Sequence, residues 1–450
     1  MRPKLRAASM AAGALCIALS ASACAGAGGG GTTAGDQKSI NVLMVNNPQM
    51  EDLQKLTADN FTKESGITVN YTILPENDVR AKISQEFSSQ AGQYDVASLS
   101  NYEIPFYSAN KWLAPLDSVT NDAEFDQDDI LPAYTASLTG EDGKLYGEPF
   151  YGESSFLMYR KDILEAKGLT MPEKPTWDQV AEIAAQADGA APGMKGICLR
   201  GQPGWGQVFA PLTTVVNTFG GTWFDKDWNA KVNSPEFVEA TKFYVDLVKK
   251  HGEAGAAQAG FTECLNNMSQ SRVAMWYDAT SAAGALEAEG SPVKGKIGYA
   301  QAPVKETDSS GWLWTWSWGV QAASKKQDAA GKFIAWASSK KYEELVASKL
   351  GWAKVPSGKR ISTYENAEFQ KAAPFFKAER SAIENADPKN PGVQERPVVG
   401  IQFVGIPEFA DLGTTVSQGV SSAIAGQGTV EDALAKGQEA AQKIGDKYKK

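Results

Sequence analysis

Residues 311–320 read GWLWTWSWGV, and a tryptophan stands at every second position from Trp312 to Trp318. In an extended strand alternate side chains project from the same face, so this spacing places four indoles on one side. A helix would distribute the same rings around its circumference. The segment therefore predicts a β-strand with one aromatic face, bounded by Gly311 and Gly319.

An aromatic strand face has two common uses in proteins. Indoles pack protein cores, but four neighbouring rings are hard to bury completely because each carries an N–H that needs a partner. Rigid aromatic surfaces also line ligand clefts, where ring faces contact C–H groups and the N–H meets a hydroxyl. We expect at least one of these indoles to line a cleft and the others to pack in the core.

The segment 39–99, earlier in the chain, alternates between two hydrophobic periodicities. Strand, helix, strand, helix, strand is the order typical of a parallel α/β sheet. In such sheets ligands bind at the carboxyl ends of the strands, where Asn47 and Glu103 lie in this sequence. The expected strands cover residues 39–45, 67–73 and 94–99, and the expected helices cover residues 51–63 and 78–89.

The middle of the chain indicates a second domain that is inserted into the first. Residues 144–161 contain a strand punctuated by Gly and Pro, which is typical of a crossing between domains, and residues 295–304 resemble a return crossing. The expected boundaries are 38–147 plus 303–345 for the first lobe and 148–302 plus 346–450 for the second.

The N-terminus indicates export. A basic start is followed by an apolar run over 7–23, too short to span a membrane and ending in small residues, as in a secretory signal peptide. The run ends in LSASAC, which resembles a bacterial lipobox with Cys24 as the lipidated residue. We expect a signal peptide over 1–23, then lipidated Cys24 and a flexible tether over 24–37.

Cysteine usage and net charge narrow the possible partners. Cys16 lies in the signal and Cys24 is the expected lipid site, so Cys198 and Cys264 are left for one disulfide. A metal site competes weakly for these thiols, because His251 is the only histidine. The net charge of −9 argues against nucleic acid, and no run after the signal is long and apolar enough for a bilayer.

Several segments together resemble one family, the extracellular solute-binding proteins of ABC importers of the maltose-binding type. The resemblance is closest to the members that bind sorbitol and mannitol, and it covers essentially the whole mature chain. The segments that carry it read PFYGESSFLMYRKD, NTFGGTWFD, AMWYDATSA, GWLWTWSWG, GWAKVP and RPVVGIQF.

The resemblance implies a fold and a function. Two α/β lobes joined by a hinge of several strands would close on a polyol or related sugar in the cleft between them. The membrane permease subunits of the importer would then recognise the closed state. We expect a monomeric binding protein rather than an enzyme, without cofactor or metal, held at the outer face of the bacterial membrane by its lipid.

Polyol recognition needs two classes of side chain, and the sequence offers both at predicted strand ends. Carboxylates and guanidinium groups pair with vicinal hydroxyls, while aromatic rings contact C–H faces. Acids are more often caps or solvated surface groups, arginines often pair with nearby acids, and aromatic residues often pack in cores. The ligand-binding candidates are Asn47, Glu103, Tyr151, Glu153, Arg200, Trp223, Trp276, Asp278, Trp314, Trp316, Trp352 and Arg396.

A glycoside hydrolase is the main alternative, because it would also use a cleft, tryptophans and paired carboxylates. Glu153 and Asp278 could then serve as acid and nucleophile. The lipoprotein start and the order of elements argue against this reading. Whether a polyol or oligosaccharide is consumed, or is bound and recovered unchanged, distinguishes the two functions.

Overall fold

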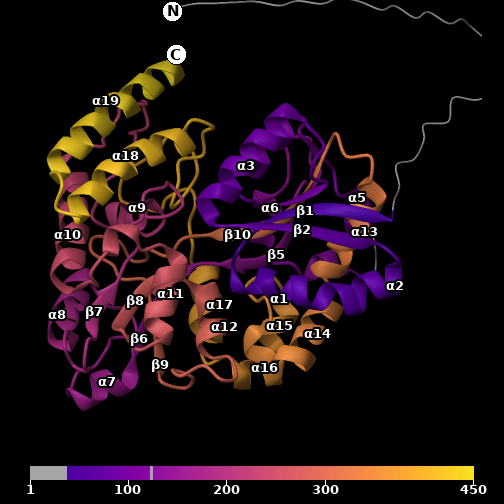
Figure 1. Ribbon diagram of the computed structural model, residues 1–450. Helices are drawn as coiled ribbons and strands as arrows, with labels where there is room; N and C mark the ends of the chain where they lie inside the picture. The colour runs from indigo at the N-terminus through magenta and orange to yellow at the C-terminus, as the bar shows by residue number, and fades with distance from the viewer. Residues whose placement is uncertain (1–37, 122–124, 450) are drawn as a thin grey trace, which may run out of the picture. The chain divides into compact units, whose positions relative to one another are not determined.

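The computed structural model describes residues 38–121 and 125–449. The expected signal peptide, the lipid site Cys24 and the tether therefore lie outside the described residues. Two β-sheets organise the described chain, as expected for an α/β fold (Figure 1). None of the described helices is both long and apolar enough to cross a membrane.

The first sheet has the strand order β2-β1-β3-β10-β4, with β5 also paired to β10. Its first three strands are parallel, as the alternation of elements predicts, and β1 in the centre is largely buried. These strands are β1 (Ser39–Val45), β2 (Thr68–Leu74) and β3 (Val96–Ser100). The others are β4 (Leu113–Ala114), β5 (Glu148–Glu153) and β10 (Trp314–Gln321).

Strand β10 contains three of the four alternating tryptophans, and all eight of its residues are buried. The predicted strand is confirmed, but it begins and ends later than expected, so that Gly319 lies inside it. A Cβ at Gly319 would stand 2.5 Å from a methyl carbon of Leu99, and only glycine fits this approach of β10 to β3. Trp318 packs in the core against Phe150 and Phe333.

The second sheet has the order β7-β8-β6-β9. Only Ser154 separates β5 of the first sheet from β6 of the second, so the chain crosses between the sheets at this residue. Strand β5 falls in the range expected for the second lobe, but it pairs with β10 in the first sheet. The strands are β6 (Ser155–Arg160), β7 (Lys195–Cys198), β8 (Val273–Ala279) and β9 (Ile297–Gln301).

Helices cover both sheets, and α18 and α19 pack against each other and against α10 (Figure 1). Before β6 the helical elements are α1 (Pro48–Thr57), η1 (Ala58–Thr62), α2 (Lys63–Ser65), α3 (Glu76–Ser89), α4 (Glu103–Ala109), α5 (Asp117–Thr120), η2 (Gln127–Asp129) and α6 (Pro132–Ser137). Between β6 and β10 they are α7 (Lys161–Ala166), α8 (Trp177–Ala187), α9 (Phe209–Thr218), α10 (Pro235–His251), η3 (Ala256–Gln258), α11 (Phe261–Ser269), η4 (Thr280–Ala282) and α12 (Ala283–Leu286). After β10 they are α13 (Gln327–Ala337), α14 (Lys340–Leu350), η5 (Trp352–Lys354), α15 (Ile361–Glu365), α16 (Ala367–Ala372), α17 (Phe376–Glu384), α18 (Phe409–Ile424) and α19 (Val430–Tyr448).

The expected disulfide between Cys198 and Cys264 is present. Cys198 ends β7 and Cys264 lies on α11, and both are fully buried. The bond therefore fixes α11 to the second sheet, and the N-terminal residue of that helix, Phe261, faces the cavity described below.

Candidate functional site

A cavity of about 430 Å³, its opening included, lies where the ends of the two sheets meet. Its wall combines charged, amide and aromatic side chains, and the small residues Gly206, Ala210 and Ala279 leave room between them. This mixture is typical of a site for a polar ligand with apolar faces. The remaining lining residues are Asn47, Glu76, Arg80, Glu153, Arg200, Trp205, Phe261, Ser281, Trp312, Trp314, Trp316 and Gln402.

The aromatic part of the wall surrounds the guanidinium group of Arg80. Its central carbon lies 4.3 Å from the ring centroid of Trp205, 4.9 Å from that of Trp314 and 4.8 Å from that of Trp316. Cation–π attraction at these distances fixes the rings and the charge relative to one another. Two of the alternating tryptophans of β10, Trp314 and Trp316, therefore line the cavity, near the start of the strand.

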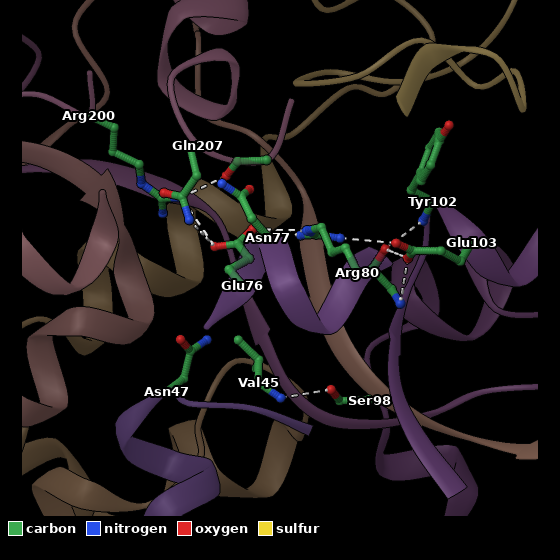
Figure 2. Close-up of polar contacts among 12 residues, drawn as sticks. Val45, Asn47, Glu76, Asn77, Arg80, Ser98, Tyr102, Glu103, Arg200 and Gln207 are labelled. Atoms are coloured by element: carbon green, nitrogen blue, oxygen red, sulfur yellow. Dashed lines mark hydrogen bonds and ion pairs between the residues drawn. The ribbon is translucent and has the colours of Figure 1, made fainter. Parts of the chain in front are cut away.

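Arg80 also forms two ion pairs within the first lobe (Figure 2). It lies one helical turn after Glu76 on α3, and its Nη2 donates to Glu76 Oε1 at 2.8 Å. Its Nη1 donates to Glu103 Oε1 at 3.0 Å. The other carboxylate oxygen of Glu103 accepts from the backbone N–H of Ser100, so this acid is a support for Arg80.

Arg200 is held in the second lobe by Asp278. Its Nε and Nη2 donate to the two carboxylate oxygens at 2.8 and 2.6 Å, and its Nη1 donates to Gly206 O at 2.8 Å. Burial alone would lower the pKa of Arg200, but the charge and hydrogen bonds of Asp278, together with the smaller effects of Glu76 and Glu153, raise that pKa overall. Trp276 Nε1 also donates to Asp278, so Trp276 and Asp278 orient Arg200 from behind the wall.

Several contacts join the first lobe to the second across the cavity (Figure 2). Glu76 Oε2 lies 3.6 Å from Arg200 Nη1 and accepts from Gln207 Nε2 at 3.3 Å. Asn77 Nδ2 donates to Pro203 O at 2.9 Å, and Gln49 Nε2 donates to Ser281 O at the same distance. The two sides of the cleft therefore contact each other in this structure.

Glu153 lies opposite these arginines at the end of β5, directly across from Trp314 on β10. Burial raises the pKa of Glu153 to about 8, although a hydrogen bond from Ser281 Oγ works in the other direction. At neutral pH this carboxyl group is therefore mostly protonated and can both donate and accept. Nearby, Asn47 Nδ2 donates to the hydroxyl of Tyr151 at 2.7 Å, which fixes the amide of Asn47 toward the cavity.

The structure brings together five of the twelve candidates on the cavity wall: Asn47, Glu153, Arg200, Trp314 and Trp316. Four others do not line this cavity but lie behind its wall and hold its members, directly or through another residue. These are Glu103, which supports Arg80, Tyr151, which supports Asn47, and Asp278 and Trp276, which support Arg200.

The remaining three candidates lie away from this cavity. Trp223 is fully buried among Phe209, Phe237 and Phe409, because the loop before it returns into the core of the second lobe. Trp352 lines a separate surface hollow beside α14 and α16. Arg396 donates to Asn217 Oδ1 at 2.6 Å and to Gly400 O, an anchor for the C-terminal loop.

Sequence reasoning missed several wall residues. Glu76 and Arg80 lie just after β2, so the strand-end argument that pointed to Asn47 and Glu103 applies to this position too. Trp205 stands between two glycines, in a loop with no periodic pattern. The other missed members of the wall are Phe261, Ser281, Trp312 and Gln402.

Two mixed α/β sheets joined by crossings, with a polar and aromatic cavity between them, define the class of two-lobe solute-binding proteins. Comparison with known proteins agrees: residues 46–344 match the family model described as bacterial extracellular solute-binding protein. The chain belongs to this family, whose members serve ABC importers as binding proteins and not as enzymes. The comparisons give no support to a glycoside hydrolase.

Relatives and solved structures place the chain more narrowly within the family. It is 37% identical over 404 residues to the mannitol-binding protein of Pseudomonas aeruginosa, covering 89% of this chain and 92% of that protein. A solute-binding protein of Agrobacterium vitis S4 with bound D-mannitol has a TM-score of 0.89 and 45% identity, over 91% of this chain and 99% of the other. One of Agrobacterium radiobacter K84 in complex with ribitol has a TM-score of 0.80 and 25% identity, over 90% and 98%.

Buried carboxyl groups make the stability of the protein depend on pH. Burial raises the pKa values of Glu148 and Glu153 to about 8 and that of Glu379 to about 7, against an ordinary value of 4.5. Between the ordinary pKa of 4.5 and these raised values, the folded chain binds more protons than the unfolded chain. The free energy of unfolding therefore falls as the pH rises through this range. We expect the melting temperature to fall between pH 5 and about pH 8.5.

Glu148→Gln provides the matched measurement for this prediction. Both carboxyl oxygens of Glu148 are buried without a hydrogen-bond partner among the described residues, and Arg360 and Lys359 offset only part of the burial. The variant should show a shallower decline of melting temperature with pH than the natural chain. Parallel curves for the two proteins would show that Glu148 does not titrate in this range.

Proposed function

We propose that the protein captures an acyclic polyol of the mannitol, sorbitol or ribitol type and delivers it to the membrane permease of an ABC importer. The observation that carries the proposal is the composition of the cavity, where indole rings face two guanidinium and two carboxyl groups. The named ligands of the relatives, mannitol and ribitol, support the same class of ligand.

The wall matches the chemistry of a polyol chain. The rings of Trp314 and Trp316 offer apolar faces to C–H groups, while a protonated Glu153 can donate to one hydroxyl and accept from another. Gln402 Oε1 is buried and has no hydrogen-bond partner among the described residues, so a ligand hydroxyl would satisfy it. These groups bind hydroxyls and leave the ligand chemically unchanged.

Capture follows from the contacts between the lobes. The bonds from Asn77 to Pro203 and from Gln49 to Ser281 hold the two sides of the cavity together, so they break when the lobes open to admit or release a ligand. A ligand that contacts Glu153 and Arg200 at once favours the closed arrangement, because only that arrangement places both around it. The permease then receives the ligand from the closed protein.

A thermal-shift and calorimetry screen with mannitol, sorbitol, arabitol, xylitol, glucose and maltose tests the proposal. A ligand that binds only the folded state raises the melting temperature by mass action. Trp316→Ala should abolish the polyol-induced shift, whereas Trp352→Ala, outside the cavity, should preserve it. No shift with any polyol, or conversion of the polyol during incubation, would contradict the proposal.

We further propose that the mature protein is a monomer tethered to the outer face of the cell membrane by a lipid on Cys24. The lipobox-like segment before Cys24 supports this anchor. Cys24→Ser should move the protein from the membrane fraction to the medium or periplasm, with the polyol-binding activity retained. A protein that stays in the membrane fraction after this substitution would argue against the lipid.

A further inference from the structure

The cavity and the layer behind it contain more carboxyl groups than guanidinium groups. Two arginines, Arg80 and Arg200, are the cations of the wall. Glu76 and Glu153 stand on the wall beside them, while Glu103 and Asp278 stand behind it. The site therefore holds four carboxyl groups around two guanidinium groups.

The donors of Arg80 are largely committed to protein carboxylates. Its Nε and Nη2 both donate to Glu76 Oε1, at 3.1 and 2.8 Å, and its Nη1 donates to Glu103. The bidentate edge that would recognise a ligand carboxylate or phosphate is thus occupied by Glu76.

Arg200 is committed in the same way. Its bidentate edge is filled by Asp278, and its Nη1 donates to Gly206 O and lies 3.6 Å from Glu76 Oε2. Glu76 is therefore the one carboxylate among the described residues that contacts both arginines. It connects them across the cavity, one from each lobe (Figure 2).

The raised pKa of Glu153 also indicates that this wall disfavours a buried negative charge. Burial is the largest cause that raises the pKa of Glu153, and Ser281 and Arg200 offset only part of it. The neighbouring Asp278 and Glu76 add smaller effects that also raise this pKa. A carboxyl group in this wall thus resists carrying a negative charge, chiefly because it is buried, and a ligand anion buried beside it would meet the same cost of burial.

From this geometry we infer that Glu76 makes the site select neutral polyols over anionic polyols of the same chain length. Aldonates and alditol phosphates are the excluded class. An anion in a buried site needs a cation that is free to pair with it, and Glu76 already occupies one arginine and contacts the other. Neutral hydroxyls need no such partner and use the remaining N–H groups. The inference rests on the proposed polyol-binding function and adds the charge of the ligand to it.

Titration calorimetry with mannitol and with sodium mannonate, at matched ionic strength, tests the inference on the full mature chain. Mannonate has the same six-carbon chain and carries a carboxylate at one end. The natural protein should bind mannonate at least about a hundredfold more weakly than mannitol. Glu76→Gln keeps the shape of the side chain and removes its charge. This variant should reduce the ratio of the mannonate Kd to the mannitol Kd by about tenfold or more.

Two further variants separate the charge of Glu76 from other effects. Glu76→Asp keeps the charge and should keep the discrimination, even if mannitol binds more weakly. Glu103→Gln removes the other carboxylate partner of Arg80, one that does not line the cavity, and should narrow the ratio much less than Glu76→Gln. A melting curve of each variant confirms that it is folded.

The outcomes distinguish this inference from the proposed function. If the natural protein binds mannonate within about threefold of mannitol, the selection does not exist and the inference is wrong, whatever the variants do. If Glu103→Gln or Glu76→Asp narrows the ratio as much as Glu76→Gln, the charge of Glu76 is not its cause. If the natural protein binds no polyol, the proposed function fails first.

Discussion

Asp278→Asn is expected to weaken polyol binding by about a hundredfold and to lower the free energy of unfolding by about 3–5 kcal/mol. Asp278 is completely buried, and its two oxygens take the bidentate edge of Arg200. An amide in its place leaves a buried guanidinium without its charged partner, and Arg200 then loses its orientation toward the cavity. Titration calorimetry with the best polyol of the screen, together with urea denaturation of the unliganded protein, measures both effects.

Asp162→Asn is the matched control for this prediction. Asp162 also accepts two hydrogen bonds from one arginine, Arg160, at 2.8 and 2.6 Å, but its side chain is 40% exposed and does not line the cavity. Solvent screens this pair, so the control should lose about 1 kcal/mol or less and no affinity. Equal losses of unfolding free energy and of polyol affinity in the two variants would show that the buried Arg200–Asp278 pair has no special role.

The role of Asp278 marks a limit of what the sequence could predict. Its place near the end of an apolar strand pointed to the region of the cavity, but the strand pattern could not tell a ligand-facing carboxylate from one that holds an arginine. That distinction depends on Arg200, 78 positions earlier in the chain, and on the side from which it approaches.

The strands and the site were predictable to different degrees for a physical reason. Strands β1, β2 and β3 can be predicted from hydrophobic periodicity, which is a property of consecutive residues. The alternation of Trp314, Trp316 and Trp318 predicts β10 in the same way. The wall residues Glu76, Arg80 and Trp205 come from segments that meet only when the two lobes fold and touch. Trp223 resembles the cavity tryptophans in sequence, and only its packing against Phe209 and Phe237 reveals a core residue.

Gly358→Ala is expected to be among the most destabilising single substitutions in the chain. Gly358 has φ of +87°, and a Cβ there would stand 1.9 Å from the carbonyl oxygen of Gly152 in β5. The backbone must shift to relieve this overlap, beyond the strain of a side chain at positive φ, and together these cost about 2–6 kcal/mol. Because β5 ends in Glu153, the shift should also weaken polyol binding.

Gly351→Ala separates the two contributions. Gly351 has a similar φ of +94°, but a Cβ there would meet no atom within 4 Å, so this variant should lose only about 1–3 kcal/mol and keep its affinity. Urea denaturation gives the free energies of unfolding, and calorimetry gives the affinities of the folded fractions. Equal stability and equal affinity in the two alanine variants would mean that the close approach of Gly358 to Gly152 does not position β5. A larger loss at Gly358, accompanied by weaker polyol binding, is the result expected if this glycine contact holds Glu153 in the cavity wall.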